Sequence, residues 1–146
     1  MGSQGPTLLD DLARGSYRLT APRRQVAALI GARAGSFTAA DLMADASRRG
    51  VRIGRATVFR ALDTFSELGA LERLELDGGD HAYVVCGPRS EHHHHVVCRS
   101  CGRASEIIGC DLEPWALQVQ RATGYEVDRH RIELYGICPR CQSPRA

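Results

Sequence analysis

Two cysteine pairs carry the clearest chemistry in this 146-residue sequence. Cys98-x-x-Cys101 and Cys138-x-x-Cys141 each place two sulfurs where a tight turn can bring both onto one ion. Two such pairs complete a tetrahedral four-thiolate zinc site. Because four thiolates leave no open coordination position, the pattern predicts a structural zinc that joins the C-terminal strand to the start of its domain. Four reduced cysteines without a metal are the alternative.

Four consecutive histidines, His92 to His95, form the second ligand-bearing pattern. Alternate side chains of a strand point to opposite faces, so His93 and His95 would share one face, and His92 and His94 the other. One strand could therefore supply two metal sites, and imidazole favours zinc, copper, nickel or iron. An exposed polar strand without metal is the alternative. The remaining ligands could come from several residues that spacing alone does not separate: Glu72, His81, Cys86, Asp111, Glu113 and His130.

The composition indicates a folded protein that does not cross a membrane. Apolar residues make up 43% of the sequence and charged residues 25%, which is ordinary for a folded domain. The longest aliphatic run, residues 26–30, is far shorter than the roughly 20 apolar residues of a membrane span, and no secretory signal is evident. We therefore expect a cytoplasmic protein, whose six cysteines serve as metal ligands or free thiols rather than disulfides. Cys110 has no evident partner and is expected to be a buried or free thiol.

Charge is distributed unevenly along the chain, although the net charge is only +2. Residues 1–60 hold ten arginines against four aspartates, whereas residues 61–84 hold one arginine against six acidic residues. A basic N-terminal part within a nearly neutral protein fits an anionic partner bound on one face. Scattered surface arginines are the alternative.

The first half of the sequence predicts three helices. Thr20 would cap the first, with Pro22 in its first turn. Residues 38–41 have the form of a capping box that starts the second. The third is expected over residues 54–68, with an apolar face formed by Val58, Ala61, Leu62, Phe65 and Leu68.

Two strands, residues 71–76 and 82–85, should follow as a hairpin closed by the turn at residues 77–80. Several helices followed by such a hairpin make a winged helix-turn-helix, in which the helix over 54–68 would read DNA. Arginine can bond guanine edges or phosphates, and an exposed aromatic ring can contact a thymine methyl. The outward side of the helix offers such side chains: Arg55, Phe59 and Arg60. An ordinary amphipathic helix with solvated arginines is the alternative.

A change of pattern at Gly87 and Pro88 indicates a hinge between two domains. We expect a winged-helix DNA-binding domain over residues 1–85, a hinge over 86–91, and a metal-binding domain over 92–146. The expected elements of the latter are strands over 92–98 and 103–108, a helix over 111–123 with Trp115, Leu117 and Val119 partly buried, and β-structure over 125–137.

Taken in order, these motifs resemble the ferric-uptake-regulator (Fur) superfamily of dimeric, metal-sensing bacterial repressors. The resemblance spans about residues 8–141. Its signature stretches are Thr20-Ala21-Pro22-Arg23, the segment 54–60, Gly78-Gly79, and the histidine cluster that runs into Cys98-x-x-Cys101-Gly102. It implies an α+β protein with an N-terminal winged helix-turn-helix domain and a small α/β dimerisation domain. Such a homodimer would bind double-stranded operator DNA, with no enzymatic activity, no small organic substrate and no membrane partner.

The resemblance also implies a role for individual residues. The structural zinc ligands would be Cys98, Cys101, Cys138 and Cys141. The regulatory metal ligands would be Glu72, Cys86, His93 and His95. A further site would use His92, His94, Glu113 and His130. DNA contacts would come from Arg18, which looks like the residue that enters the minor groove, and from Arg55, Thr57, Phe59 and Arg60.

Cys86 indicates which metal is sensed. Iron-sensing members usually have a carboxylate at this position and a histidine near the start of the third helix, where this sequence has none in residues 35–38. A thiolate is softer than a carboxylate and suits tetrahedral zinc. The set therefore resembles the zinc-uptake regulator (Zur) branch, although Glu72 replaces the more usual aspartate. We expect up to three zinc ions per chain and repression of zinc-uptake genes.

Three other functions remain as alternatives. One is an iron-sensing regulator of the same superfamily. A zinc enzyme would need an open coordination position and a general base, and no His-Glu-x-x-His motif occurs in the sequence. A zinc-storage module would leave the basic first 60 residues and the pair Phe59-Arg60 without a role.

Overall fold

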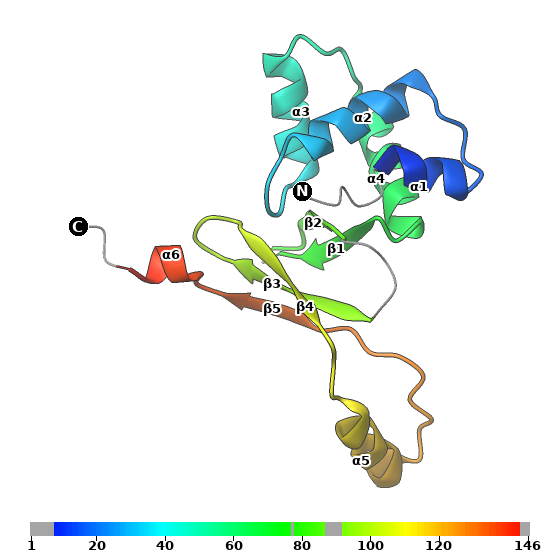
Figure 1. The fold of residues 1–146 in the computed structure, drawn as a ribbon, viewed down its shortest axis with the longest axis vertical. Helices are drawn as coiled ribbons and strands as arrows, with labels where there is room; N and C mark the ends of the chain where they lie inside the picture. The colour runs from blue at the N-terminus through cyan, green and yellow to red at the C-terminus, as the bar shows by residue number, and fades with distance from the viewer. Residues whose placement is uncertain (1–7, 77, 87–91, 144–146) are drawn as a thin grey trace, which may run out of the picture.

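The computed structural model describes residues 8–76, 78–86 and 92–143. Its first half contains α1 (Leu8–Arg14), α2 (Ala21–Gly31), α3 (Ala39–Arg48), α4 (Arg55–Glu67), β1 (Leu71–Glu75) and β2 (His81–Val85). Its second half contains β3 (His93–Cys98), β4 (Ala104–Ile108), α5 (Glu113–Thr123), β5 (Glu133–Gly136) and α6 (Pro139–Gln142). The architecture is α+β, as predicted (Figure 1). Asp77 of the predicted turn and residues 87–91 of the predicted hinge lie outside the described residues.

The predicted helix starts are present. The Thr20 side chain accepts a hydrogen bond from the backbone N–H of Arg23. At α3 the capping box is reciprocal: Thr38 Oγ1 accepts from Asp41 N at 3.1 Å, and Asp41 Oδ2 accepts from Thr38 N at 2.8 Å. Each cap satisfies backbone donors that the first turn leaves unpaired, which fixes where the helix begins.

Helices α1–α4 enclose one apolar core, which also includes the start of the hairpin. Its largest fully buried side chains include Leu12, Ile30, Phe37, Leu42 and Phe65. Four of the five residues predicted for the inner face of the third helix are buried: Val58, Ala61, Leu62 and Phe65. Leu68 is half-buried instead, because α4 ends at Glu67.

The second half is built on a three-stranded sheet in the order β4-β3-β5. Strand β3, which carries His93 to His95, is the centre strand. It is antiparallel to β4 and parallel to β5. Val97 of β3 packs against Leu74, Ala82 and Val84 of the hairpin, which places the sheet against the first half. Strand β5 covers only Glu133–Gly136, much less than the predicted 125–137.

Helix α5 stands apart from the sheet (Figure 1). It has no buried residue: Trp115 is 57% exposed and Leu117 is 45% exposed. The prediction that these two are partly buried is therefore wrong for the single chain, because the helix lies outside the reach of both cores. Val119 is half-buried, as predicted. No described helix is long and apolar enough to cross a membrane.

Candidate metal centres and DNA-binding face

Three groups of potential ligands occur among the described residues, each with ligand atoms that lie within 4.8 Å of one another. The thiolate group consists of Cys98, Cys101, Cys138 and Cys141. The bridging group consists of Glu72, Cys86, His93 and His95. The histidine group consists of His92, His94, Cys110 and His130. Strand β3 contributes to all three, and its alternation separates the histidines onto two faces as predicted.

The thiolate group is assembled by the pairing of β3 with β5. Their register places Cys98 beside Gly136, so Cys138 arrives next to Cys98 and donates its backbone N–H to Cys98 Sγ at 3.3 Å. The sulfurs of Cys101 and Cys138 are 3.7 Å apart. Four sulfurs placed tetrahedrally at about 2.3 Å from zinc would be about 3.8 Å apart, so the arrangement fits that ion.

The electrostatics of the thiolate group also favour a cation. Backbone N–H groups of Cys138 and Cys101 lower the pKa of Cys98 to about 6, which leaves it ionised at neutral pH. The Ser100 hydroxyl lowers the pKa of Cys141, but the neighbouring sulfurs of Cys138 and Cys101 outweigh it and raise that pKa to about 11. Four adjacent thiols cannot all ionise without a positive charge between them.

The thiolate group rests directly on the first half of the chain. The Gly102 carbonyl, beside Cys101, accepts hydrogen bonds from Ser36 N at 2.8 Å and Ser36 Oγ at 3.0 Å. A Cβ on Gly35, whose φ is +78°, would lie 2.6 Å from that carbonyl oxygen. Glycine is therefore needed for this close approach.

The bridging group joins the hairpin to the sheet. Glu72 lies on β1, Cys86 follows β2, and His93 and His95 lie on β3. Glu72 Oε2 and His95 Nδ1 are 2.6 Å apart, and this hydrogen bond holds the pKa of Glu72 below its usual value. An ionised carboxylate can only accept, so Nδ1 carries the proton of His95.

That tautomer leaves His95 Nε2 as an acceptor. The side chain is 2% exposed, and Nε2 has no hydrogen-bond partner in the described part of the chain. A buried acceptor without a partner is costly, and a coordinated metal ion would satisfy it, with the other ring nitrogen donating to a carboxylate as metal-bound histidines commonly do. The bridging group therefore fits a metal ion, with Glu72 placed to orient His95 as well as to offer its own oxygens.

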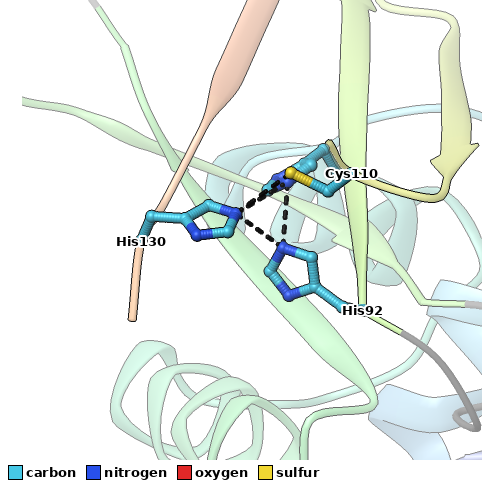
Figure 2. A group of neighbouring side chains, drawn as sticks. His92, Cys110 and His130 are labelled. Carbon is cyan, nitrogen blue, oxygen red and sulfur yellow. Dashed lines mark hydrogen bonds between the residues drawn. The ribbon is translucent and has the colours of Figure 1, made fainter. Parts of the chain in front are cut away.

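The histidine group differs from its predicted composition. The Nε2 atoms of His92, His94 and His130 converge, and Cys110 Sγ lies 3.2 Å from His130 Nε2 (Figure 2). Glu113, the first residue of α5, is not part of the group. Cys110, which was expected to have no partner, takes the fourth place. Spacing could not identify it, because it follows the turn after β4 rather than a strand position.

Four of the five predicted DNA-binding residues lie on α4: Arg55, Thr57, Phe59 and Arg60. Arg55 and Arg60 are exposed, and Thr57 and Phe59 are half-buried. The Arg55 guanidinium lies over the Phe59 ring, 5.2 Å from its centre, while part of that ring packs on the core. Arg18 is exposed ahead of α2. The helix thus offers two exposed arginines beside one half-buried aromatic ring.

Both the sequence and the structure of this chain are similar to those of known proteins. The model of the Ferric uptake regulator family matches residues 14–135. The zinc uptake regulation protein of Mycobacterium tuberculosis is 33% identical over 133 residues, which is 90% of this chain and 100% of that protein. The ferric uptake regulation protein of Neisseria meningitidis is 30% identical over 127 residues, 86% of this chain and 87% of that protein.

A solved structure described as a zinc uptake regulator complexed with zinc and DNA superposes with a TM-score of 0.69. It is 25% identical, and the match covers 89% of this chain and 87% of that one.

Proposed function

The chain belongs to the ferric uptake regulator family of metal-responsive transcription regulators, which are not enzymes, and we propose that it is a zinc-sensing repressor. In this proposal the zinc-loaded homodimer binds palindromic operator DNA in the cytoplasm and represses zinc-uptake genes. The observation that carries it is the bridging group, which combines ligands from the hairpin and from the sheet.

The donor set favours zinc over iron. Cys86 adds a thiolate to the two imidazoles and the carboxylate of the group. Soft thiolate ligands suit tetrahedral zinc, whereas ferrous iron prefers harder donors in six-coordinate sites. The similarity to a zinc uptake regulation protein over the whole of that protein supports the same choice.

The position of the bridging group supports a switch. Glu72 lies on the hairpin and Cys86 directly follows it, whereas His93 and His95 lie on the sheet. One zinc ion can bind all four side chains only when the hairpin and the sheet lie close together. The four ligands therefore favour one relative placement of the winged helix, which is a shift of population. By linkage, operator DNA should strengthen zinc binding as much as zinc strengthens DNA binding.

Helix α4 and helix α5 support the other two elements of the proposal, DNA binding and dimerisation. Arg55 and Arg60 can reach base edges or phosphates from α4, and Arg18 can enter the adjoining groove. The exposed apolar side chains of α5, Trp115 and Leu117, support burial of this helix in a homodimer. Two identical winged helices in one dimer match an inverted repeat in DNA.

The thiolate group and the histidine group complete a chain with up to three zinc ions. The thiolate group has four protein ligands and no place for a substrate, which suits a structural zinc. It holds the C-terminal segment of the chain against β3, and the turn that carries Cys101 contacts Ser36 through the Gly102 carbonyl. A zinc-storage module would not need the arginine-bearing face of α4.

The test begins with selection of binding sites from random DNA duplexes by the zinc-loaded protein. The selected duplex is then titrated by fluorescence anisotropy with zinc and, anaerobically, with ferrous iron. We expect an inverted repeat that is bound with zinc and released by a chelator. Binding with ferrous iron alone would assign the protein to iron sensing.

Matched variants connect this result to the bridging group. Cys86→Ser and Glu72→Gln should each abolish the zinc-dependent increase in affinity, because each removes a group that acts at the bridging ion. Glu75→Gln makes the same change three residues further along β1, on an exposed side chain outside the group, and should bind like the parent. Unchanged zinc dependence in Cys86→Ser would refute the assignment.

A further inference from the structure

The three histidines of the histidine group form a closed triangle of contacts. Their Nε2 atoms are 3.0 Å apart for His92 and His94, 2.7 Å for His92 and His130, and 3.3 Å for His94 and His130. At these separations no water fits between the nitrogens, and the His94 side chain is itself buried. Figure 2 shows the labelled His92 and His130 rings with their nitrogens turned towards each other.

Hydrogen bonding alone cannot satisfy this triangle. Each Nε2 either carries a proton and donates or carries a lone pair and accepts. Three mutual contacts would need donor and acceptor to alternate around an odd cycle, which is impossible. One pair always faces lone pair to lone pair or proton to proton. Protonation of one ring leaves the other two lone pairs opposed, and protonation of more than one ring places like charges in contact. A cation that receives all three lone pairs removes the conflict.

Cys110 completes the coordination of such a cation. Gly109, with φ of +84°, turns the chain after β4 and brings the Cys110 sulfur to 3.2 Å from His130 Nε2. Nitrogens placed tetrahedrally at about 2.0 Å from zinc would be about 3.3 Å apart. The three nitrogen separations and the contact between Cys110 and His130 lie within about 0.6 Å of that edge, and all four ligand atoms lie within 4.8 Å of one another. We propose that His92, His94, His130 and Cys110 form a zinc site in which the Cys110 thiolate is the fourth ligand.

This assignment adds a ligand set to the proposed function. It rests on that function only in taking zinc as the bound ion. A site with three imidazoles and one thiolate is closed and softer than one completed by Glu113, and it should select zinc or cobalt over manganese or magnesium. Its ligands join β3 to the two segments that carry α5, since Cys110 precedes that helix and His130 follows it (Figure 1). The ion would fix the base of the helix that the proposed dimer buries.

Cobalt(II) is the suitable probe, because its absorption spectrum reports a bound thiolate. The test uses the full chain with zinc retained in the thiolate group, in a Cys86→Ser background that removes the other non-structural thiolate ligand. Under anaerobic conditions with a phosphine reductant, added cobalt should produce a near-ultraviolet thiolate-to-cobalt charge-transfer band together with visible bands of a tetrahedral ion. No DNA is present, so failure here is separate from failure of the proposed repression.

Further variants in this background decide which residue is the ligand. Adding Cys110→Ser should remove the charge-transfer band and weaken zinc binding at this site at least about tenfold, as loss of a metal-site partner does. Adding His130→Ala should remove the band as well. Adding Glu113→Gln should change neither band nor affinity. Zinc content of one ion per chain before and after cobalt addition shows that the thiolate group has not exchanged.

Two results would overturn the assignment. One is a charge-transfer band that survives Cys110→Ser while zinc content stays at one. The other is a loss of cobalt binding in Glu113→Gln with no effect of Cys110→Ser. Circular dichroism of each variant verifies that the protein is folded, and Cys110→Asp provides a second check, because it should keep cobalt bound but without the charge-transfer band.

Discussion

The two halves of the chain are held together in different ways. The core around α1–α4 contains sixteen buried apolar residues. Among the described residues of the second half, the buried apolar ones are Val97 and Cys98, and α5 has none. All eight residues of the thiolate and histidine groups lie in this second half. The first half thus folds by burying apolar surface, whereas we propose that the second half depends on bound ions.

This difference has a physical reason. A segment of about fifty residues buries too small a share of its surface to be stable by apolar contact alone. We propose that metal coordination replaces the missing core, since an ion binds only when the ligands are brought together and its binding free energy becomes folding free energy. In this proposal the second half responds to metal, while the first half keeps a fixed shape for DNA.

The largest expected effect comes from Cys98→Ser, which removes one ligand of the thiolate group. We expect loss of zinc and of hydrogen-exchange protection in β3 and β5, because structural zinc sites contribute about 10–16 kcal/mol to folding in small zinc-binding peptides. Helices α1–α4 should keep their protection. Hydrogen exchange followed by mass spectrometry measures both regions in one experiment.

Cys86→Ser is the matched control, because it makes the same change outside the thiolate group. It should retain one tightly bound zinc per chain and the protection of β3. Simultaneous loss of protection in all helices of Cys98→Ser would show that the two halves fold as one unit, and the comparison would fail.

Phe65→Ala is the reverse experiment, directed at the core of the first half. Phe65 is fully buried on α4. Its truncation should cost about 3–5 kcal/mol of the free energy of unfolding of α1–α4, measured by urea denaturation. Zinc content of the thiolate group should stay at one per chain. Phe59→Ala, at a half-buried ring on the same helix, should cost less.

The elements of the first half were predictable from the sequence because their signals are local. Thr20 and Thr38 cap the helices that they were expected to cap. The apolar spacing in α4 identified its inner face, because a helix that packs on one core repeats that spacing. Helix α1 was missed, since its seven residues are too few to establish a period.

The second half was predictable only in part, because its arrangement depends on distant contacts. Strand alternation assigned the four histidines to two faces from local pattern alone. The exposure of Trp115 depends on what covers α5, and the position of Cys110 depends on a turn after β4. Neither can be predicted from the residues next to it in the sequence. The division at residues 86–91 stays a prediction.

The smallest expected effect is the response of stability to acid, which should again differ between the two halves. Asp45 on α3 pairs with Arg33 and Arg48, and the hydrogen bond from Arg33 holds the pKa of Asp45 below its usual value. A depressed pKa means that the pair stabilises the folded first half fully above the ordinary carboxyl pKa of about 3.9, and that this contribution is lost as pH falls through the lower, folded value.

Metal groups that use imidazole ligands should release their ions in mild acid, because protons compete with the metal for the same nitrogen lone pairs. The second half should therefore lose metal before α1–α4 lose stability. Urea midpoints of Asp45→Asn should be lower than those of the parent near neutrality and should converge with them below about pH 4. Asp63→Asn, at an exposed position of α4, should leave the pH profile unchanged. Parallel curves for Asp45→Asn and the parent at all pH values would mean that burial of apolar residues alone accounts for the acid resistance of the first half.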